Sequence, residues 1–201
     1  MDRTWLYAGL LIVGGVSLAK VLKQGPTIRR GERLLLVGDS LAVGLAPPLG
    51  QLAKDNGVVF DSVGKVGSTV AQWVGATQLN ASLKQKLLLK PRVVLVSLGT
   101  NDEALSLESA RAELAGIDAL AAMVKAGGAE LGWVGPPKFL PGISFKPNGF
   151  TAAIRQKIPS NEYFPSETYD IPRGGDNLHP TLRGYAGWAG QIWQWMRCCS
   201  A

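Results

Sequence analysis

Short apolar runs alternate with longer amphipathic stretches along most of the chain. Four of these runs are rich in aliphatic residues and bounded by glycine, proline or polar residues, and they lie at residues 33–37, 58–63, 92–98 and 131–134. Such runs are typical of parallel strands that are buried on both faces. The stretches between and after them predict helices at residues 43–56, 70–89, 105–125, 149–157 and 182–197. This alternation predicts an α/β domain whose functional site lies beyond the carboxyl ends of the strands.

Two segments have neither helical nor strand periodicity. Residues 135–150 and 163–171 predict loops, and their aromatic side chains could line an acyl or sugar site or pack as ordinary loop residues. The last predicted helix carries Trp188, Trp193 and Trp195. We expect these rings to pack in the core with one ring exposed, although they could also mark an interface or a membrane-facing surface.

The N-terminal end has a different pattern. Residues 5–19 carry no charged side chain, and Lys20 then interrupts the run. We interpret residues 1–22 as a hydrophobic anchor or signal segment and residues 23–32 as a basic linker. As an anchor, the segment would contact the membrane through residues 5–22. As a signal peptide, it would be cleaved after Ala19 and the domain exported.

The orientation of this segment stays open. Arg3 and the small residues at positions 17 and 19 fit a signal peptide, whereas the basic residues that follow favour a domain kept in the cytoplasm. A buried helix of the domain is a third alternative. It fits less well because the segment is apolar on all faces.

Composition limits the remaining choices. The chain has 201 residues, 46% hydrophobic and 18% charged, which predicts one folded domain at residues 33–197 and a tail at residues 198–201. The net charge is +6, but most of it lies within residues 20–33. No basic stripe with interleaved aromatics is present, so we expect no nucleic-acid partner. The adjacent Cys198 and Cys199 can neither close a useful loop nor form an ordinary metal site, and they stay free thiols or lipidation sites.

Polar residues follow three of the predicted strands. Residues 38–41 read Gly-Asp-Ser-Leu and lead into a helix, so Ser40 lies near free helix amides, although Asp39 or Ser40 could simply cap that helix. Asn101 follows the third strand and could donate its amide to an oxyanion, or Asn101 or Asp102 could cap the next helix. After the second strand, Gly67 could bring a backbone amide close to a substrate.

The histidine of the chain lies just before the last helix. His179 is the single histidine, and Asp176 precedes it by three residues. A carboxylate at this spacing can fix the imidazole tautomer and stabilise the imidazolium ion. A lone histidine is usually structural or exposed, and without other ligands it forms no zinc site. The pair therefore indicates a general base rather than a metal ligand.

Four blocks, in this order, resemble the motifs of the SGNH hydrolase superfamily. They are Gly-Asp-Ser-Leu at residues 38–41, a glycine after the second strand, Gly-Thr-Asn-Asp at residues 99–102 and Asp-x-x-His at residues 176–179. The resemblance covers residues 33–197. It implies a three-layer α/β/α sandwich of the flavodoxin-like kind, with a mostly parallel sheet of about five strands. It also implies Ser40 as nucleophile, His179 as base and then acid, and Asp176 as the partner of His179.

The resemblance further implies an oxyanion hole made of the Ser40 amide, the Gly67 amide and the Asn101 side chain. Gly67 is preferred to Gly64 because Ser68, Thr69 and Trp73 follow it. The remaining motif residues are expected to shape the loops, and they are Asp39, Thr100 and Asp102. No metal or organic cofactor is required for this mechanism.

The predicted function is a serine ester hydrolase acting on small acyl esters, such as acetyl esters of a glycan or peptidoglycan. A membrane-proximal lipid esterase or thioesterase, or a non-catalytic binding module with the same fold, are the alternatives. A nucleotide-binding loop at Gly64-Lys65 is excluded because Val59 and Val66 stand where that motif needs Gly and Ser or Thr. The motifs fix neither the oligomeric state nor the natural ester.

Overall fold

A computed structural model describes residues 25–198 of the chain. The predicted anchor or signal segment at residues 1–22 lies outside the described residues, as does Cys199. Within residues 25–198, no helix combines the length and apolar character needed to cross a membrane.

Five parallel strands form the central sheet. In spatial order they are β3 (Val59–Gly64), β2 (Arg33–Gly38), β4 (Val93–Ser97), β5 (Glu130–Val134) and β6 (Tyr163–Phe164). Every residue of the central strand β4 is buried, as its continuous apolar run predicts. The α/β class and the parallel sheet of five strands are therefore confirmed.

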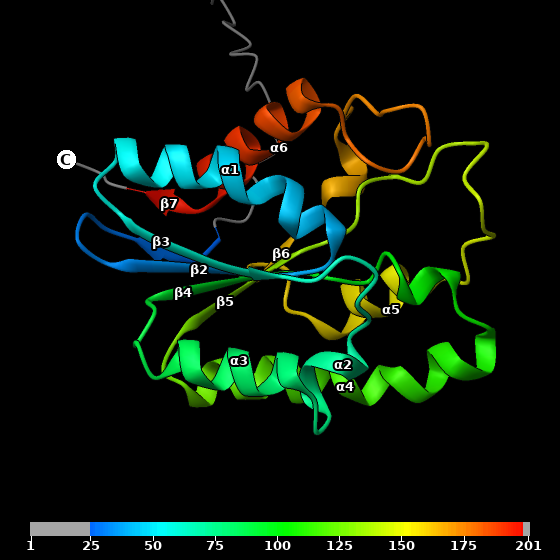
Figure 1. The fold of residues 1–201 in the computed structure, drawn as a ribbon, viewed down its shortest axis with the longest axis horizontal. Coiled ribbons are helices and arrows are strands. Elements are labelled where there is room, and N and C mark those ends of the chain that lie inside the picture. The colour runs from blue at the N-terminus through cyan, green and yellow to red at the C-terminus, as the bar shows by residue number, and fades with distance from the viewer. Residues whose placement is uncertain (1–24, 199–201) are drawn as a thin grey trace, which may run out of the picture.

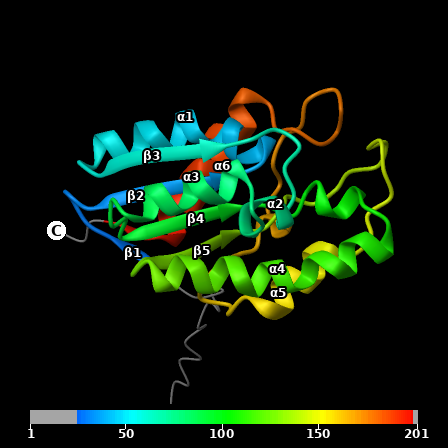
Figure 2. The ribbon, with the colours of Figure 1, turned by 60° about the horizontal axis from the view of Figure 1, so that its bottom comes forward.

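Helices cover both faces of the sheet (Figure 1, Figure 2). One face is covered by α1 (Ser40–Asp55) and α6 (Leu182–Trp195). The other is covered by α2 (Ala71–Val74), α3 (Gln78–Leu87), α4 (Leu107–Ala126) and α5 (Phe150–Lys157). Each face has its own apolar core, with Leu34 and Leu36 of β2 pointing into one and Leu35 and Val37 into the other. The result is the predicted three-layer sandwich.

Two internal segments differ from the prediction. The helix expected at residues 70–89 is split into α2 and α3, because Gly75 has an extended backbone and Thr77 starts a new helix by accepting a hydrogen bond from the Asn80 amide (3.2 Å). The loop expected at residues 163–171 contains β6 and a short 3-10 helix, Ser166–Thr168. β6 has only two residues, too few for a periodic pattern to show.

The two ends of the described chain pair with each other. Residues expected in the linker form β1 (Thr27–Ile28), which pairs in parallel with β7 (Arg197–Cys198). The last helix accordingly ends at Trp195 rather than at residue 197. The three tryptophans of α6 pack in the core, as expected, but the prediction of one exposed ring is wrong, since Trp188, Trp193 and Trp195 are all buried.

Candidate active site

Ser40 is held by a tight connection between β2 and α1. A Cβ atom at Gly38 would lie 2.0 Å from the Ser97 carbonyl oxygen of the neighbouring strand, so only glycine fits where β2 ends. Asp39 then caps α1, because its Oδ1 atom accepts a hydrogen bond from the Leu41 amide (2.8 Å). Ser40 is the first residue of the helix, and its own amide has no acceptor within that helix. The capping and the functional interpretations of this motif are therefore compatible.

His179 lies in a hairpin just before α6. The Gly174 amide donates to the His179 carbonyl (2.7 Å), and the Thr181 amide donates to the Pro172 carbonyl (3.0 Å). Asp176 closes the turn, since its Oδ1 atom accepts hydrogen bonds from the amides of Leu178 (3.0 Å) and His179 (2.9 Å). The same carboxylate that shapes the hairpin is thereby placed beside the imidazole ring.

The Asp176, His179 and Ser40 side chains form one hydrogen-bonded chain. Asp176 Oδ2 lies 2.6 Å from His179 Nδ1, and His179 Nε2 lies 2.9 Å from Ser40 Oγ. The hydrogen bond from His179, followed by the backbone hydrogen bonds, lowers the pKa of Asp176 to about 2. The side chains of His179 and Asp176 are 39% and 53% exposed, so this arrangement is open to solvent.

Asn101 and Gly67 lie on two loops that meet next to Ser40. Asn101 Nδ2 donates to the Ser68 carbonyl (2.9 Å) and lies 3.4 Å from Asp39 Oδ2. This contact brings the loop that carries Gly67 against the start of α1. Gly67 has a left-handed φ of +77° and is exposed, and no acceptor for its amide occurs among residues 25–198. Gly64 instead ends β3, in register with Gly38.

Two buried aspartates support these loops. Burial raises the pKa of Asp39 to about 7. Burial and the neighbouring Glu113 carboxyl group raise the pKa of Asp102 to about 8. Asp102 Oδ1 accepts a hydrogen bond from the Val70 amide (3.0 Å), and Glu113 accepts one from the Ala71 amide (3.1 Å). Asp102 and Glu113 therefore fix the start of α2 behind the Gly67 loop.

The alternative in which Asn101 or Asp102 caps α4 does not hold. Ser106 caps this helix by accepting a hydrogen bond from the Ser109 amide (3.2 Å), while Asn101 and Asp102 serve the neighbouring loops. Sequence reasoning also missed Glu103, a buried carboxylate that accepts hydrogen bonds from the amides of Gly149 (2.7 Å) and Thr151 (2.6 Å) at the start of α5. Its position directly after the Asn-Asp motif was the available signal.

Within residues 25–198, no cluster of three or more His, Cys, Asp or Glu residues has an arrangement that could hold a metal ion.

Solved structures match this fold, whereas no protein-family model and no curated protein matches the sequence. A candidate SGNH hydrolase from Slackia heliotrinireducens aligns over 81% of this chain and 97% of its own, with a TM-score of 0.61 and 17% identity. A psychrotrophic esterase from Pseudoalteromonas sp. aligns over 81% and 95%, with a TM-score of 0.56 and 19% identity. An acetylxylan esterase from Geobacillus stearothermophilus, solved as a catalytic mutant, aligns over 85% and 99%, with a TM-score of 0.57 and 16% identity. The chain therefore has the fold of the SGNH hydrolases.

Proposed function

We propose that this protein is a serine ester hydrolase that acts through an acyl-enzyme. The observation that carries the proposal is the continuous chain from Asp176 Oδ2 through His179 to Ser40 Oγ, with contacts of 2.6 and 2.9 Å. This geometry matches what proton transfer from a serine nucleophile to a carboxylate-oriented histidine requires. The fold, shared with an esterase and an acetylxylan esterase, supports the same conclusion.

The reaction proceeds in two acyl transfers. His179 Nε2 takes the Ser40 hydroxyl proton while Oγ attacks the ester carbonyl, and the resulting oxyanion accepts hydrogen bonds from the amides of Ser40 and Gly67 and from Asn101 Nδ2. The C–O bond of the ester then breaks, and His179 returns the proton to the departing alcohol. Water repeats these steps on the acyl-enzyme and releases the carboxylic acid and free Ser40.

A small acyl group carried on a glycan or peptidoglycan is the substrate that the site supports best. Its exposed catalytic side chains can meet an ester on a polymer without enclosing the rest of the molecule. Two exposed apolar side chains lie close to site residues along the chain. Leu182 (91% exposed) follows His179, and Val66 (68% exposed) directly precedes Gly67. A hollow of about 230 Å³ adjoins the first turn of α1 and is lined in part by Ala42, Val43 and Gly64.

Hydrolysis of p-nitrophenyl acetate by the purified protein tests the proposal. We expect Ser40→Ala and His179→Ala each to lower kcat/KM by at least about 1,000-fold, because each removes a reacting group. Asp176→Asn should lower it by about 100- to 10,000-fold, because an amide can accept the same backbone hydrogen bonds but favours the wrong imidazole tautomer.

Ser82→Ala on α3 is the matched control, since it removes a serine hydroxyl away from the site, and it should leave kcat/KM unchanged. Circular dichroism establishes that every variant is folded. Hydrolysis by the folded Ser40→Ala variant at the rate of the unsubstituted protein would contradict the mechanism, as would a folded protein that hydrolyses no acetyl ester, whether of p-nitrophenol or of a glycan.

A further inference from the structure

The edge of the sheet where the strands begin carries an excess of positive charge. We call this surface the strand-start face and define it by Arg29, Arg30, Arg33, Leu88, Leu89 and Lys90. Gly31, Arg33, Val59, Leu89, Lys90 and Arg92 line one hollow of about 510 Å³, so residues on both sides of β2 share this surface. It lies opposite the catalytic loops, which follow the carboxyl ends of the same strands (Figure 1).

The acidic groups at this edge already have partners. Glu130 pairs with Arg92 and accepts a hydrogen bond from the Thr27 amide (2.8 Å), and Glu162 pairs with Lys125 (2.8 Å). Two further carboxylates accept hydrogen bonds from neutral groups: Glu32 from the Arg29 amide (2.7 Å), and Asp55 at the end of α1 from Gln51 Nε2 (2.7 Å). By contrast, four basic side chains of this surface form no ion pair within residues 25–198. They belong to Arg29, Arg30, Arg33 and Lys90. Their charges remain available to an anionic partner.

Two leucines project from the same surface. Leu88 and Leu89, in the turn between α3 and β4, are 76% and 50% exposed, and the exposed Lys90 follows them directly. Adjacent exposed leucines flanked by basic side chains match the interface of a bilayer, where apolar groups enter the headgroup region and cations meet lipid phosphates.

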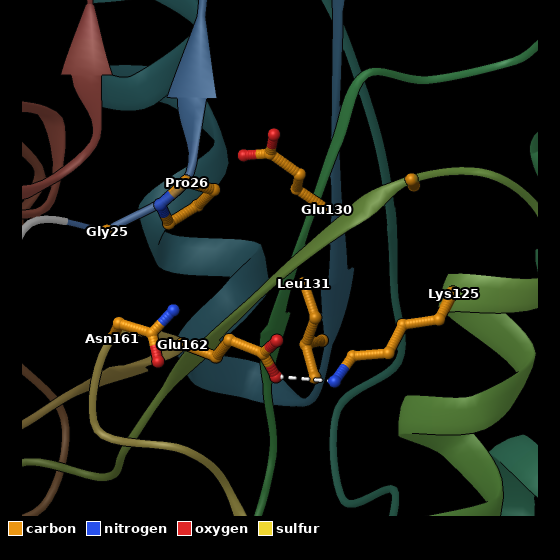
Figure 3. Close-up of a pocket in the computed structure, with 8 residues that line it drawn as sticks. Gly25, Pro26, Lys125, Glu130, Leu131, Asn161 and Glu162 are labelled. Atoms are coloured by element: carbon orange, nitrogen blue, oxygen red, sulfur yellow. Dashed lines mark ion pairs between the residues drawn. The ribbon is translucent and has the colours of Figure 1, made fainter.

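The described chain starts four residues before Arg29 of this surface. The Gly25 amide donates to the carbonyl of Trp195 at the end of α6 (3.0 Å), and Gly25 and Pro26 lie near Glu130 at the start of β5 (Figure 3). The uncharged run at residues 5–19 is only six residues away from Gly25 along the chain. Six residues can span at most about 20 Å, so a membrane that held this run would lie within about 20 Å of Gly25, from which β1 leads to Arg29 of the strand-start face.

We propose that the strand-start face rests on an anionic lipid bilayer, with Leu88 and Leu89 in the headgroup region and the unpaired cations on lipid phosphates. The six residues of β2 then hold Ser40 about 20 Å from the lipid surface, at 3.3 Å per residue. The catalytic site faces away from the membrane. Given the proposed ester hydrolase function, its substrate is an ester on a water-soluble molecule or polymer and not on a lipid of the supporting bilayer.

The test compares two exposed leucines at opposite edges of the sheet. The full chain, with Cys198→Ser and Cys199→Ser, carries an NBD fluorophore on either Leu88→Cys or Leu107→Cys and is reconstituted in phosphatidylcholine vesicles. Leu107 is 60% exposed and begins α4, beyond the carboxyl end of β4. With about 30% phosphatidylglycerol in the vesicles, we expect dithionite to reduce the position 88 label about tenfold more slowly than the position 107 label.

Charge reversal tests the cause of this protection. Arg29→Glu, Arg30→Glu and Lys90→Glu together should leave flotation with the vesicles intact but make the label at position 88 as accessible as that at position 107. Equal accessibility in the unsubstituted background, or failure of the full chain to float, would overturn the proposal. So would protection of position 88 without vesicles, which would indicate a second copy of the chain.

A separate measurement tests whether the substrate is a water-soluble ester or a lipid of the supporting bilayer. The reconstituted protein should hydrolyse p-nitrophenyl acetate in the surrounding buffer but release no fatty acid from the vesicle lipids. Release of lipid fatty acid would overturn the outward orientation. Failure to hydrolyse p-nitrophenyl acetate with the label still protected would count against the ester hydrolase function and leave the membrane-facing surface in place.

Discussion

Asp39 is a fully buried carboxyl group next to Ser40, and its protonation makes stability depend on pH. Its pKa is about 7, against 3.8 for an unfolded aspartate. Between these values the folded protein binds a proton that the unfolded chain has lost, so the free energy of unfolding falls as pH rises from about 4 to about 7. The contribution of Asp39 to this fall is up to about 4 kcal/mol, at about 1.4 kcal/mol per pKa unit.

Asp39→Asn should therefore flatten this pH dependence while it keeps the cap on α1, because an amide oxygen can also accept the hydrogen bond from Leu41. Urea denaturation at several pH values between 4 and 7 measures the effect. The slope should be reduced and not abolished, since the pKa of Asp102 is also raised, to about 8. The matched control is Asp55→Asn at an exposed carboxylate of α1. Identical slopes for Asp39→Asn and the unsubstituted protein would show that the prediction is wrong.

At the level of single residues, sequence reasoning pointed to residues in short local motifs that the structure brings together. Ser40, Asp176 and His179 could be placed because each stands at a strand end or helix start within a recognisable block. Glu103 and Glu113 could not, because their partners lie 46 and 42 residues away along the chain. Only the folded packing of α4 against α2, and of the residues around Glu103 against α5, shows which amides they hold.

The start of α6 packs tightly against the hairpin that carries His179. A Cβ atom at Gly184 would lie 2.3 Å from the Pro172 carbonyl oxygen, a backbone atom of the hairpin. We expect Gly184→Ala to lower the free energy of unfolding by about 1–3 kcal/mol through overpacking. The displaced hairpin should also lower kcat/KM for p-nitrophenyl acetate by about 10- to 100-fold, because His179 moves relative to Ser40.

Gly187→Ala is the control in the same helix. Nothing lies within 4 Å of a Cβ atom at Gly187, so this substitution should raise stability by up to about 1 kcal/mol through helix propensity. Its activity should not change. Urea denaturation and ester hydrolysis of both variants check these expectations, and equal effects at positions 184 and 187 would contradict the packing argument.

At the level of elements, periodicity located the long helices and the buried strands but not the breaks and the short pairings. Gly75 breaks the helix expected at residues 70–89, and the helical periodicity on both sides of it conceals this break. β6 and the β1–β7 pair have two residues per strand, so their existence depends on partners brought close by the sheet. The burial of all three tryptophans of α6 likewise depends on the tertiary fit of that helix.

At the level of the whole molecule, the two edges of the sheet have different compositions. The carboxyl edge collects the motifs of Ser40, Asn101 and His179, as expected for parallel α/β sheets. The opposite edge joins residues 29–33 to residues 88–90, and only the order β3-β2-β4 brings these distant segments together. The catalytic edge could therefore be anticipated from the sequence, whereas the strand-start face required the structure.

The separation of these edges predicts that catalysis and lipid contact are energetically independent. Sites about 20 Å apart with no shared partners usually have additive effects. Arg29→Glu, Arg30→Glu and Lys90→Glu together should leave kcat/KM for p-nitrophenyl acetate within about twofold, because long-range effects of exposed charges are screened by salt. Conversely, Ser40→Ala should leave the protection of a label at position 88 unchanged. A large loss of turnover in the folded triple variant would mean that the two edges communicate through the sheet, and the description of two independent surfaces would then be wrong.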